Sequence, residues 1–291
     1  MLRLFSRNLT ILGCSLVIFL AVSAFAQTSN PMTKRDLADD GFSIVAPSDS
    51  SFESELQHLN FDKKPEMSTL KPFSVILRNS SSRSVVAFAI KWVVSDASGK
   101  VLTRSFNYIE PSGLLDGGRE KTKRALVEHQ IRPGGTRLLT TNGMDRTEDE
   151  LRDLASSPLP ESVQHVEIDL AVFDDGESIG PNTLGLMEIF AAYVNARQDV
   201  MEEVDSRTAK GENLKNVVAD IKSRLTPEAD TVQVTPRAIY GRNVRAYLTE
   251  LETTERNFGE ATAKNAVSGY KYTVRPNIHL RPSRQTKGGR I

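Results

Sequence analysis

Cysteine and histidine are scarce in this chain, and their scarcity argues against several kinds of enzyme. The 291 residues include one cysteine, Cys14, and four histidines. If the leader described below is removed, the mature protein has no cysteine and therefore neither a disulfide nor a catalytic thiolate. No two histidines have the H-x3-H spacing of zinc ligands, so the sequence predicts no zinc site.

Sequence motifs also give no support for a nucleotide-binding enzyme or for an acyl-transfer enzyme. Gly113 and Gly118 have the internal spacing of a phosphate-binding loop, but Arg119 and Glu120 follow where that loop requires Lys and then Ser or Thr. We identify no serine nucleophile of the hydrolase type. The sequence therefore predicts no catalytic residues, no cofactor and no metal, and it favours a protein that is not an enzyme.

An excess of charge of either sign is lacking as well. The chain has 37 basic and 37 acidic residues, and its first 26 residues contain Arg3 and Arg7 but no acid. Without those 26 residues, 35 basic and 37 acidic residues remain, a net charge of −2. A near-neutral chain gives no electrostatic reason to expect a nucleic acid as partner.

The amino terminus has the pattern of a secretory signal peptide. Two arginines precede an apolar run at 9–25, which ends in Ala24-Phe25-Ala26. A charged segment, an apolar segment and an A-x-A site predict a signal peptide over 1–26 with cleavage after Ala26. We therefore expect the mature protein to be secreted or periplasmic.

Two alternatives place the protein at a membrane. The apolar run approaches the ~18 residues of a spanning helix, so an uncleaved anchor would tether the chain. Cys14 follows Ile11-Leu12-Gly13, which loosely resembles a lipidation site. Most of the apolar run comes after Cys14, whereas a lipidated cysteine follows such a run, so the sequence favours cleavage.

The clearest folding pattern spans residues 71–94. Two apolar runs with a period of two flank the polar segment 79–84, which predicts a β-hairpin. We expect the large side chains of the second run to share one face and to anchor a core: Val86, Phe88, Ile90, Trp92 and Val94.

The rest of the chain divides into a strand-rich and a helix-rich part. We expect a loop at 48–54, a helix at 147–155 that begins with a capping box, and a strand at 163–173 with one solvated face. Other strands are expected at 42–45, 101–109, 125–131 and 137–141, and helices at 182–206, 214–225 and 240–251.

These elements predict an α+β protein in which an N-terminal antiparallel β-sandwich is followed by a C-terminal helical segment. The expected organisation is a signal peptide at 1–26, a flexible lead at 27–41, a β-sandwich at 42–178, a helical region at 181–268 and an extended basic tail at 269–291.

Part of this pattern resembles a known class of module. A strand that ends in Leu77-Arg78-Asn79-Ser80, a serine-rich turn and a strand with an aromatic core resemble immunoglobulin-like or fibronectin-like modules of secreted bacterial proteins. The residues that carry the resemblance are Phe73–Asn79 and Val85–Trp92, supported by Val166–Gly176, and it covers residues 42–176 at most. No cysteine pair surrounds Trp92. Such modules commonly bind proteins or carbohydrate, or act as spacers, which is what the resemblance implies here.

Two functional hypotheses follow. The first is an exported, non-enzymatic binding or envelope-assembly protein, whose partner is an envelope protein or polymer and whose oligomeric state the sequence leaves open. The alternative is an exported hydrolase in which four acids converge in three dimensions: Asp169, Asp174, Asp175 and Glu177.

Three weaker signals each have a plain structural explanation beside the functional one. The acidic turn at 174–177 is able to touch calcium but lacks the D-x-D-x-D pattern. Asn79-Ser80-Ser81 fits a glycosylation site and also a turn. The basic tail fits an anionic partner and also a solvated terminus.

Overall fold

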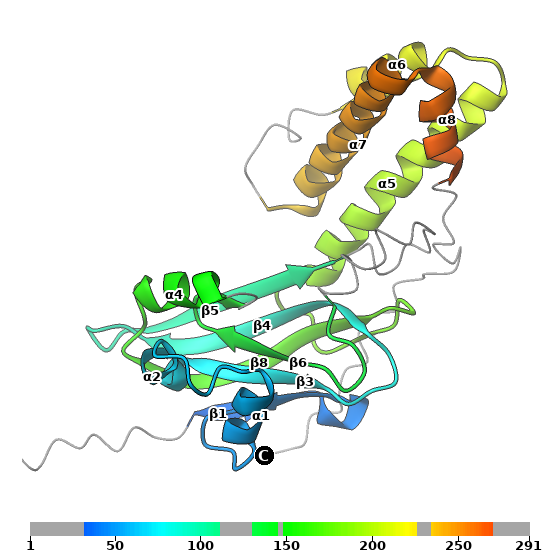
Figure 1. Ribbon diagram of the computed structural model, residues 1–291. Helices are drawn as coiled ribbons and strands as arrows, with labels where there is room; N and C mark the ends of the chain where they lie inside the picture. Colours follow the sequence, from blue (N-terminus) through cyan, green and yellow to red (C-terminus); the bar gives the residue numbers. More distant parts are fainter. Residues whose placement is uncertain (1–31, 111–129, 145–147, 226–233, 270–291) are drawn as a thin grey trace, which may run out of the picture. The chain divides into compact units, whose positions relative to one another are not determined.

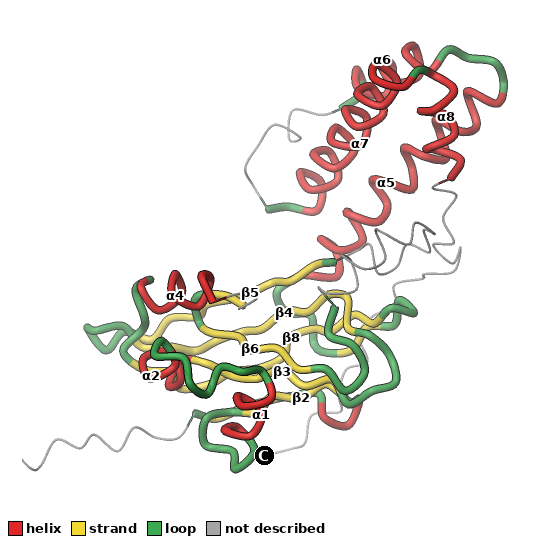
Figure 2. Tube along the Cα trace, in the orientation of Figure 1, coloured by secondary structure: helices red, strands yellow, loops and turns green. Residues whose placement is uncertain are grey.

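The computed structural model describes residues 32–110, 130–144, 148–225 and 234–269, and these residues combine helices with two β-sheets (Figures 1 and 2). They belong to one compact unit. The expected signal peptide, the glycines at 113 and 118, most of the strand at 125–131 and the tail beyond Gly269 lie outside the described residues. No described helix is long and apolar enough to cross a bilayer.

The first sheet, sheet A, has the order β1-β8-β4-β5. Its strands are β1 (Thr33–Arg35), β4 (Val85–Ser95), β5 (Val101–Ile109) and β8 (Ser162–Phe173), and the short β9 (Ser178–Ile179) also pairs with β8. β1 runs parallel to β8, and the other pairs are antiparallel. Residues 32–41 were expected to be a flexible lead, yet they contribute β1 and the short 3-10 helix η1 (Ala38–Asp40).

The second sheet, sheet B, is antiparallel with the order β2-β3-β6-β7. It consists of β2 (Phe42–Val45), β3 (Ser74–Asn79), β6 (Thr136–Thr140) and β7 (Gly143–Met144). The strands expected at 42–45 and 137–141 are thus confirmed within a residue.

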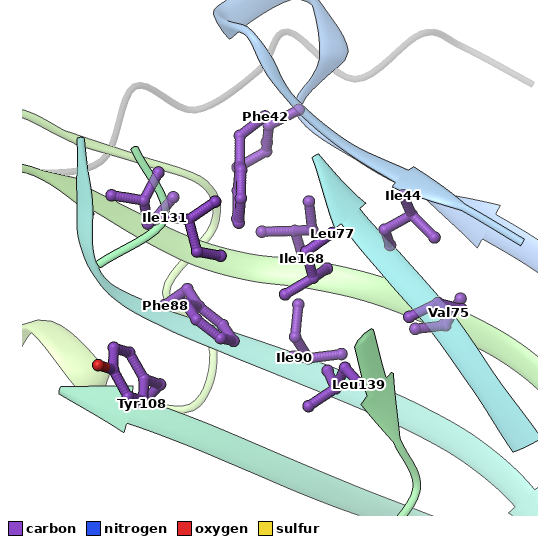
Figure 3. Close-up of a cluster of buried hydrophobic side chains, with 14 of the residues drawn as sticks. Phe42, Ile44, Val75, Leu77, Phe88, Ile90, Tyr108, Ile131, Leu139 and Ile168 are labelled. Atoms are coloured by element: carbon purple, nitrogen blue, oxygen red, sulfur yellow. The ribbon is translucent and has the colours of Figure 1, made fainter. Parts of the chain in front are cut away.

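The two sheets share a hydrophobic cluster. Sheet B contributes Phe42, Leu77 and Leu139, which lie with Phe88 and Ile168 of sheet A (Figure 3). The rings of Phe42 and Phe88 approach with centroids 6.1 Å apart. Removal of these side chains from water is the main favourable term that holds one sheet against the other.

The predicted hairpin at 71–94 is wrong in its pairing. Both strands exist, but β3 pairs with β2 and β6, whereas β4 pairs with β5 and β8. Segment 80–84 therefore crosses from one sheet to the other. Period two defines which residues share a face of a strand, but it carries no information about the neighbouring strand.

Three β-bulges also change the expected faces. The register between β4 and β8 shifts at Val86, at Asp169 and at Gln164. Val86 therefore lies with Ala87 in the cluster beneath α5, and beyond Asp169 the residues Leu170 and Val172 point away from the inter-sheet cluster. Because a bulge inserts one unpaired residue, it reverses the alternation beyond it.

Short helices cover the outer face of sheet B. α1 (Phe52–His58), α2 (Met67–Leu70) and α4 (Glu148–Ser156) surround a second cluster that includes Phe52, Leu56 and Leu151. A further 3-10 turn, η2 (Lys71–Phe73), leads into β3. The loop expected at 48–54 is therefore wrong from Phe52 onward, while the helix expected at 147–155 is confirmed by α4.

Four longer helices follow the sheets. They are α5 (Leu186–Ala209), α6 (Leu214–Ser223), α7 (Pro236–Phe258) and α8 (Glu260–Gly269). The first half of α5 packs on sheet A through Leu186 and Phe190, and its second half packs with α6, α7 and α8. The strand β8, expected to have one solvated face, is buried on both faces from Ile168 to Phe173 because α5 covers its outer side.

Candidate functional site

Within the described residues, helix α5 covers only part of the outer face of sheet A. The cluster beneath it includes the facing pairs Ala87–Val172 and Ala89–Leu170. Beyond this cluster, the register places the next two rows of side chains across the four strands β1, β8, β4 and β5. We call these eight residues the open face: Thr33, Arg35, Lys91, Val93, Thr103, Ser105, His165 and Glu167.

The open face is polar and partly exposed. Arg35, Thr103 and Ser105 are exposed, whereas Lys91 and Glu167 are half-buried. Lys91 is the one charged residue of β4, and it pairs with Glu167 of β8. A lysine in an otherwise apolar central strand is accommodated because its ammonium group is both paired and close to solvent.

A chain of polar contacts crosses the open face from the sheet edge toward α5. The hydroxyl of Thr33 lies 2.9 Å from Nδ1 of His165, and Nε2 of His165 lies 3.6 Å from Oε2 of Glu167. Lys91 donates to Oε1 of Glu167 and, at 3.0 Å, to the hydroxyl of Thr183. These mutual contacts restrict the rotamers of the charged groups, so the face is preorganised.

Asp169 ends this chain at the boundary between the open and the covered halves. It is fully buried, and its carboxylate accepts from the N–H and the hydroxyl of Thr183 at 2.9 and 2.5 Å and from the N–H of Leu184 at 2.8 Å. Because Asp169 is the unpaired residue of a bulge, its side chain leaves the ladder and reaches the segment before α5.

The segment between β9 and α5 is fitted closely to this bulge. A Cβ at Gly180 would lie 2.5 Å from the carbonyl oxygen of Asp169, so no larger residue fits there without movement. Asn182 donates its N–H to the same carbonyl, and its side-chain oxygen accepts from the N–H of Met187. These bonds satisfy backbone groups at the start of α5 and fix where the helix begins.

The four acids of the hydrolase hypothesis do not meet at one site. Asp175 and Glu177 both pair with Arg83, at 3.0 Å for Asp175, whereas Asp169 is bound to Thr183 and Leu184. Asp174 is exposed, and its N–H donates to the carbonyl of Ser84. The acidic turn thus fastens the β8–β9 turn to the crossing segment 80–84.

Electrostatics of this turn are dominated by Arg83. Its guanidinium carbon lies 3.9 Å from the centre of the Phe173 ring, which gives a cation–π contact. Burial alone would raise the pKa of Asp175, but the N–H of Glu177 and the Arg83 guanidinium together lower this pKa below its ordinary value. Both features describe a structural ion pair.

A serine-hydrolase motif does occur, and the interpretation of the sequence overlooked it. Gly176–Gly180 reads GESIG, which fits G-x-S-x-G. A nucleophile elbow presents its serine on a sharp turn between a strand and a helix. Ser178 instead is 1% exposed and lies in β9, opposite Val172 of β8. The motif therefore lacks the geometry of an elbow.

Two other expectations concern glycosylation and metal. The side chain of Asn79 is buried, its amide nitrogen donates to the carbonyls of Arg83 and Ile131, and its oxygen accepts from Ser81. Asn79 is therefore a turn residue of the folded protein and is closed to a glycan. Among the described residues, no group of three or more His, Cys, Asp or Glu side chains is placed to hold a metal ion.

The open face was not among the sites that the sequence predicted. The available signals were the lysine that interrupts the apolar run of β4, and His165 and Glu167 two positions apart on one strand. Two residues apart on a strand means one face, but their union with Lys91 depends on strand pairing. Comparisons of the chain with protein-family models, curated proteins and solved structures found no match.

Proposed function

We propose that this chain is an exported, non-enzymatic binding protein that holds an envelope protein or an envelope polymer on the open face. Export follows the signal-peptide pattern, with the mature chain secreted or periplasmic after cleavage at Ala26. A membrane enters this proposal only through retention of the apolar leader, and nucleic acid is not the partner.

The proposal is carried by the half of sheet A that no helix of the described residues covers. Elsewhere in the described chain, hydrophobic clusters pack on both faces of the central strands. The open face instead presents a hydroxyl, an imidazole, two cations and a carboxylate from three adjacent strands, at Thr33, Arg35, Lys91, His165 and Glu167. Hydrogen-bond donors and acceptors held in fixed positions, together with charges of both signs, suit a polar partner of complementary charge.

The proposed scaffold is an immunoglobulin-like or fibronectin-like sandwich, with α5 packed on the outer face of sheet A and short helices packed on the outer face of sheet B. The cluster shared by the two sheets and their mainly antiparallel pairing support this architecture. Binding and spacing are common roles of such modules, but the fold alone does not assign a role. The open face is what favours binding.

Partner capture with matched variants tests the proposal. The full chain would be immobilised and exposed to envelope extract, beside a double variant, Arg35→Glu with His165→Ala, and a control, Lys215→Glu. Lys215 lies on α6 with 75% of its side chain exposed. We expect the double variant to weaken capture of a specific partner by about tenfold or more, ~1.4 kcal/mol, while the control binds as the unaltered chain.

Hydrogen exchange completes this experiment. In the complex, amides of β4 and β8 near Lys91 and His165 should gain protection, and circular dichroism should show that each variant is folded. Recovery of no partner, or equal capture by the double variant and the control, would contradict the proposal.

A further inference from the structure

Among the described strands, β5 is a long edge strand with little protection against pairing. It ends the order of sheet A with nine residues, Val101–Ile109. The other terminal strands of the described sheets are shorter: three residues in β1, which carries Lys34 and Arg35, four in β2 and two in β7. Proteins commonly blunt sheet edges by shortness and by charge, and β5 has one charged residue, Arg104.

The backbone of β5 presents its free groups in a defined register. The N–H of Glu110 donates to the carbonyl of Val86 at 2.8 Å, so even-numbered positions of β5 bond to β4. In an antiparallel ladder these groups alternate. The N–H and C=O of Val101, Thr103, Ser105 and Asn107 are therefore directed at the edge that has no partner strand among the described residues.

The side chains of β5 are those of a strand that is half covered. Leu102 and Phe106 pack against the inter-sheet cluster but remain partly exposed. Thr103, Ser105 and Asn107 are exposed on the opposite face, and none of these three is charged. A neighbouring strand would complete the packing of Leu102 and Phe106 without burying a charge on the outer face.

We propose that two copies of this chain pair antiparallel through β5, with the two-fold axis at Ser105. This register pairs all nine residues, and it makes bonded pairs of those positions whose N–H and C=O groups point at the edge. Ser105 faces Ser105, Thr103 faces Asn107 and Val101 faces Ile109. On the inner face, Leu102 lies opposite Tyr108 and Arg104 opposite Phe106.

Charge and shape favour a second copy as the occupant. A shift of the axis to Arg104 would place two arginines directly opposite each other, which is unfavourable. The axis at Ser105 instead sets each arginine against a phenylalanine ring, a favourable cation–π arrangement. The dimer joins two sheets A edge to edge, so the two open faces become neighbours. It does not depend on the proposed binding function.

Solution mass and a proline variant test the dimer. Ser105→Pro removes an N–H that points out of the sheet, and proline is tolerated at an edge in that position. Light scattering over a concentration series should give twice the mass of one mature chain for the unaltered protein and for the control Ser105→Ala. Ser105→Pro should give a monomer with an unchanged circular dichroism spectrum.

Cysteine cross-linking tests the register. The mature chain has no cysteine once residues 1–26 are removed. In that chain, Ser105→Cys places two cysteines at a bonded antiparallel pair, where Cα atoms are about 5.5 Å apart and a disulfide is possible. Thr103→Cys alone places them four residues out of register and should not cross-link, whereas a mixture of Thr103→Cys and Asn107→Cys chains should. A monomer at all concentrations, a dimer that survives Ser105→Pro, or cross-linking of Thr103→Cys alone would overturn the proposal.

Discussion

The buried carboxylate of Asp169 holds Thr183 by two bonds at once, from its N–H at 2.9 Å and from its hydroxyl at 2.5 Å. This contact fastens the segment before α5 to a bulge of β8. Lys91 reaches the same hydroxyl from the open face, so the covered and the open halves of sheet A are joined at these residues.

Replacement of Asp169 should destabilise the protein strongly. Asp169→Asn keeps the shape but gives the amide group donors where N–H groups already point, and it leaves buried donors unpaired. We expect the free energy of unfolding to fall by about 3 kcal/mol, measured by urea denaturation. Thr183→Ala, at an exposed position, should cost about 1 kcal/mol. Equal, small effects of both changes would show that this contact is not important for stability.

Asn79 should contribute more to the stability of the fold than its polar neighbour Ser80. Asn79→Ala removes the amide bonds to Arg83 and Ile131 and leaves their carbonyls without this donor, so we expect a loss of about 2–3 kcal/mol. Ser80→Ala removes one exposed bond, to the carbonyl of Gly41, and should change stability by less than about 1 kcal/mol. Thermal or urea unfolding of the two variants decides whether the structure of the crossing segment 80–84 depends on Asn79.

The lowered pKa of Asp175 in the acidic turn leads us to expect a loss of stability at low pH. The folded pKa of Asp175 is lowered from 3.8, because the N–H of Glu177 and the guanidinium of Arg83 outweigh the effect of burial. A lowered pKa contributes stability above the unfolded value of 3.8, and this contribution disappears as the pH falls through the lower folded pKa. Urea unfolding of the unaltered chain and of Arg83→Gln between pH 6 and pH 2 should therefore converge at the acid end. A constant difference at every pH would contradict this origin.

The raised pKa of Tyr240 leads us to expect a loss of stability at high pH. Burial, and then the bond of its hydroxyl to Asp199 at 2.7 Å, raise its pKa to about 12. The unfolded chain ionises Tyr240 near pH 10, so the neutral folded form contributes stability that is complete below pH 10 and lost as the pH rises through about 12. Tyr240→Phe should lose less stability over that interval than the unaltered chain. Identical pH profiles would exclude Tyr240 as the source.

The strands and helices were largely predictable from local pattern. Period two in residues 85–94 and 163–173, and helical spacing after residue 180, identify β4, β8 and the helices α5, α6 and α7, because side-chain alternation follows directly from backbone geometry. The helix α8 was not predicted as a separate element. Turn chemistry was less reliable: Phe52, read as part of a loop, starts α1, where it is buried in the cluster beneath the short helices.

The candidate site could not be predicted from the sequence, because local pattern does not show which strands pair. Lys91 is far in the sequence from His165 and Glu167, and the acids that stood out, at 174–177, stabilise a turn. G-x-S-x-G at 176–180 was overlooked, and Ser178 is buried in a short strand. Which side chains share a surface depends on strand pairing, and pairing is decided by contacts between distant residues.

The sequence by itself determined the type of most long elements, namely the strands β4, β5 and β8 and the helices α5, α6 and α7, and the change from strands to helices near residue 180. Tertiary structure decided the rest, namely that β3 and β4 belong to different sheets, that bulges at Val86 and Asp169 reverse two faces, and that α5 covers half of sheet A. Local periodicity fixes the direction of each side chain, whereas coverage depends on which distant segment removes that side chain from water.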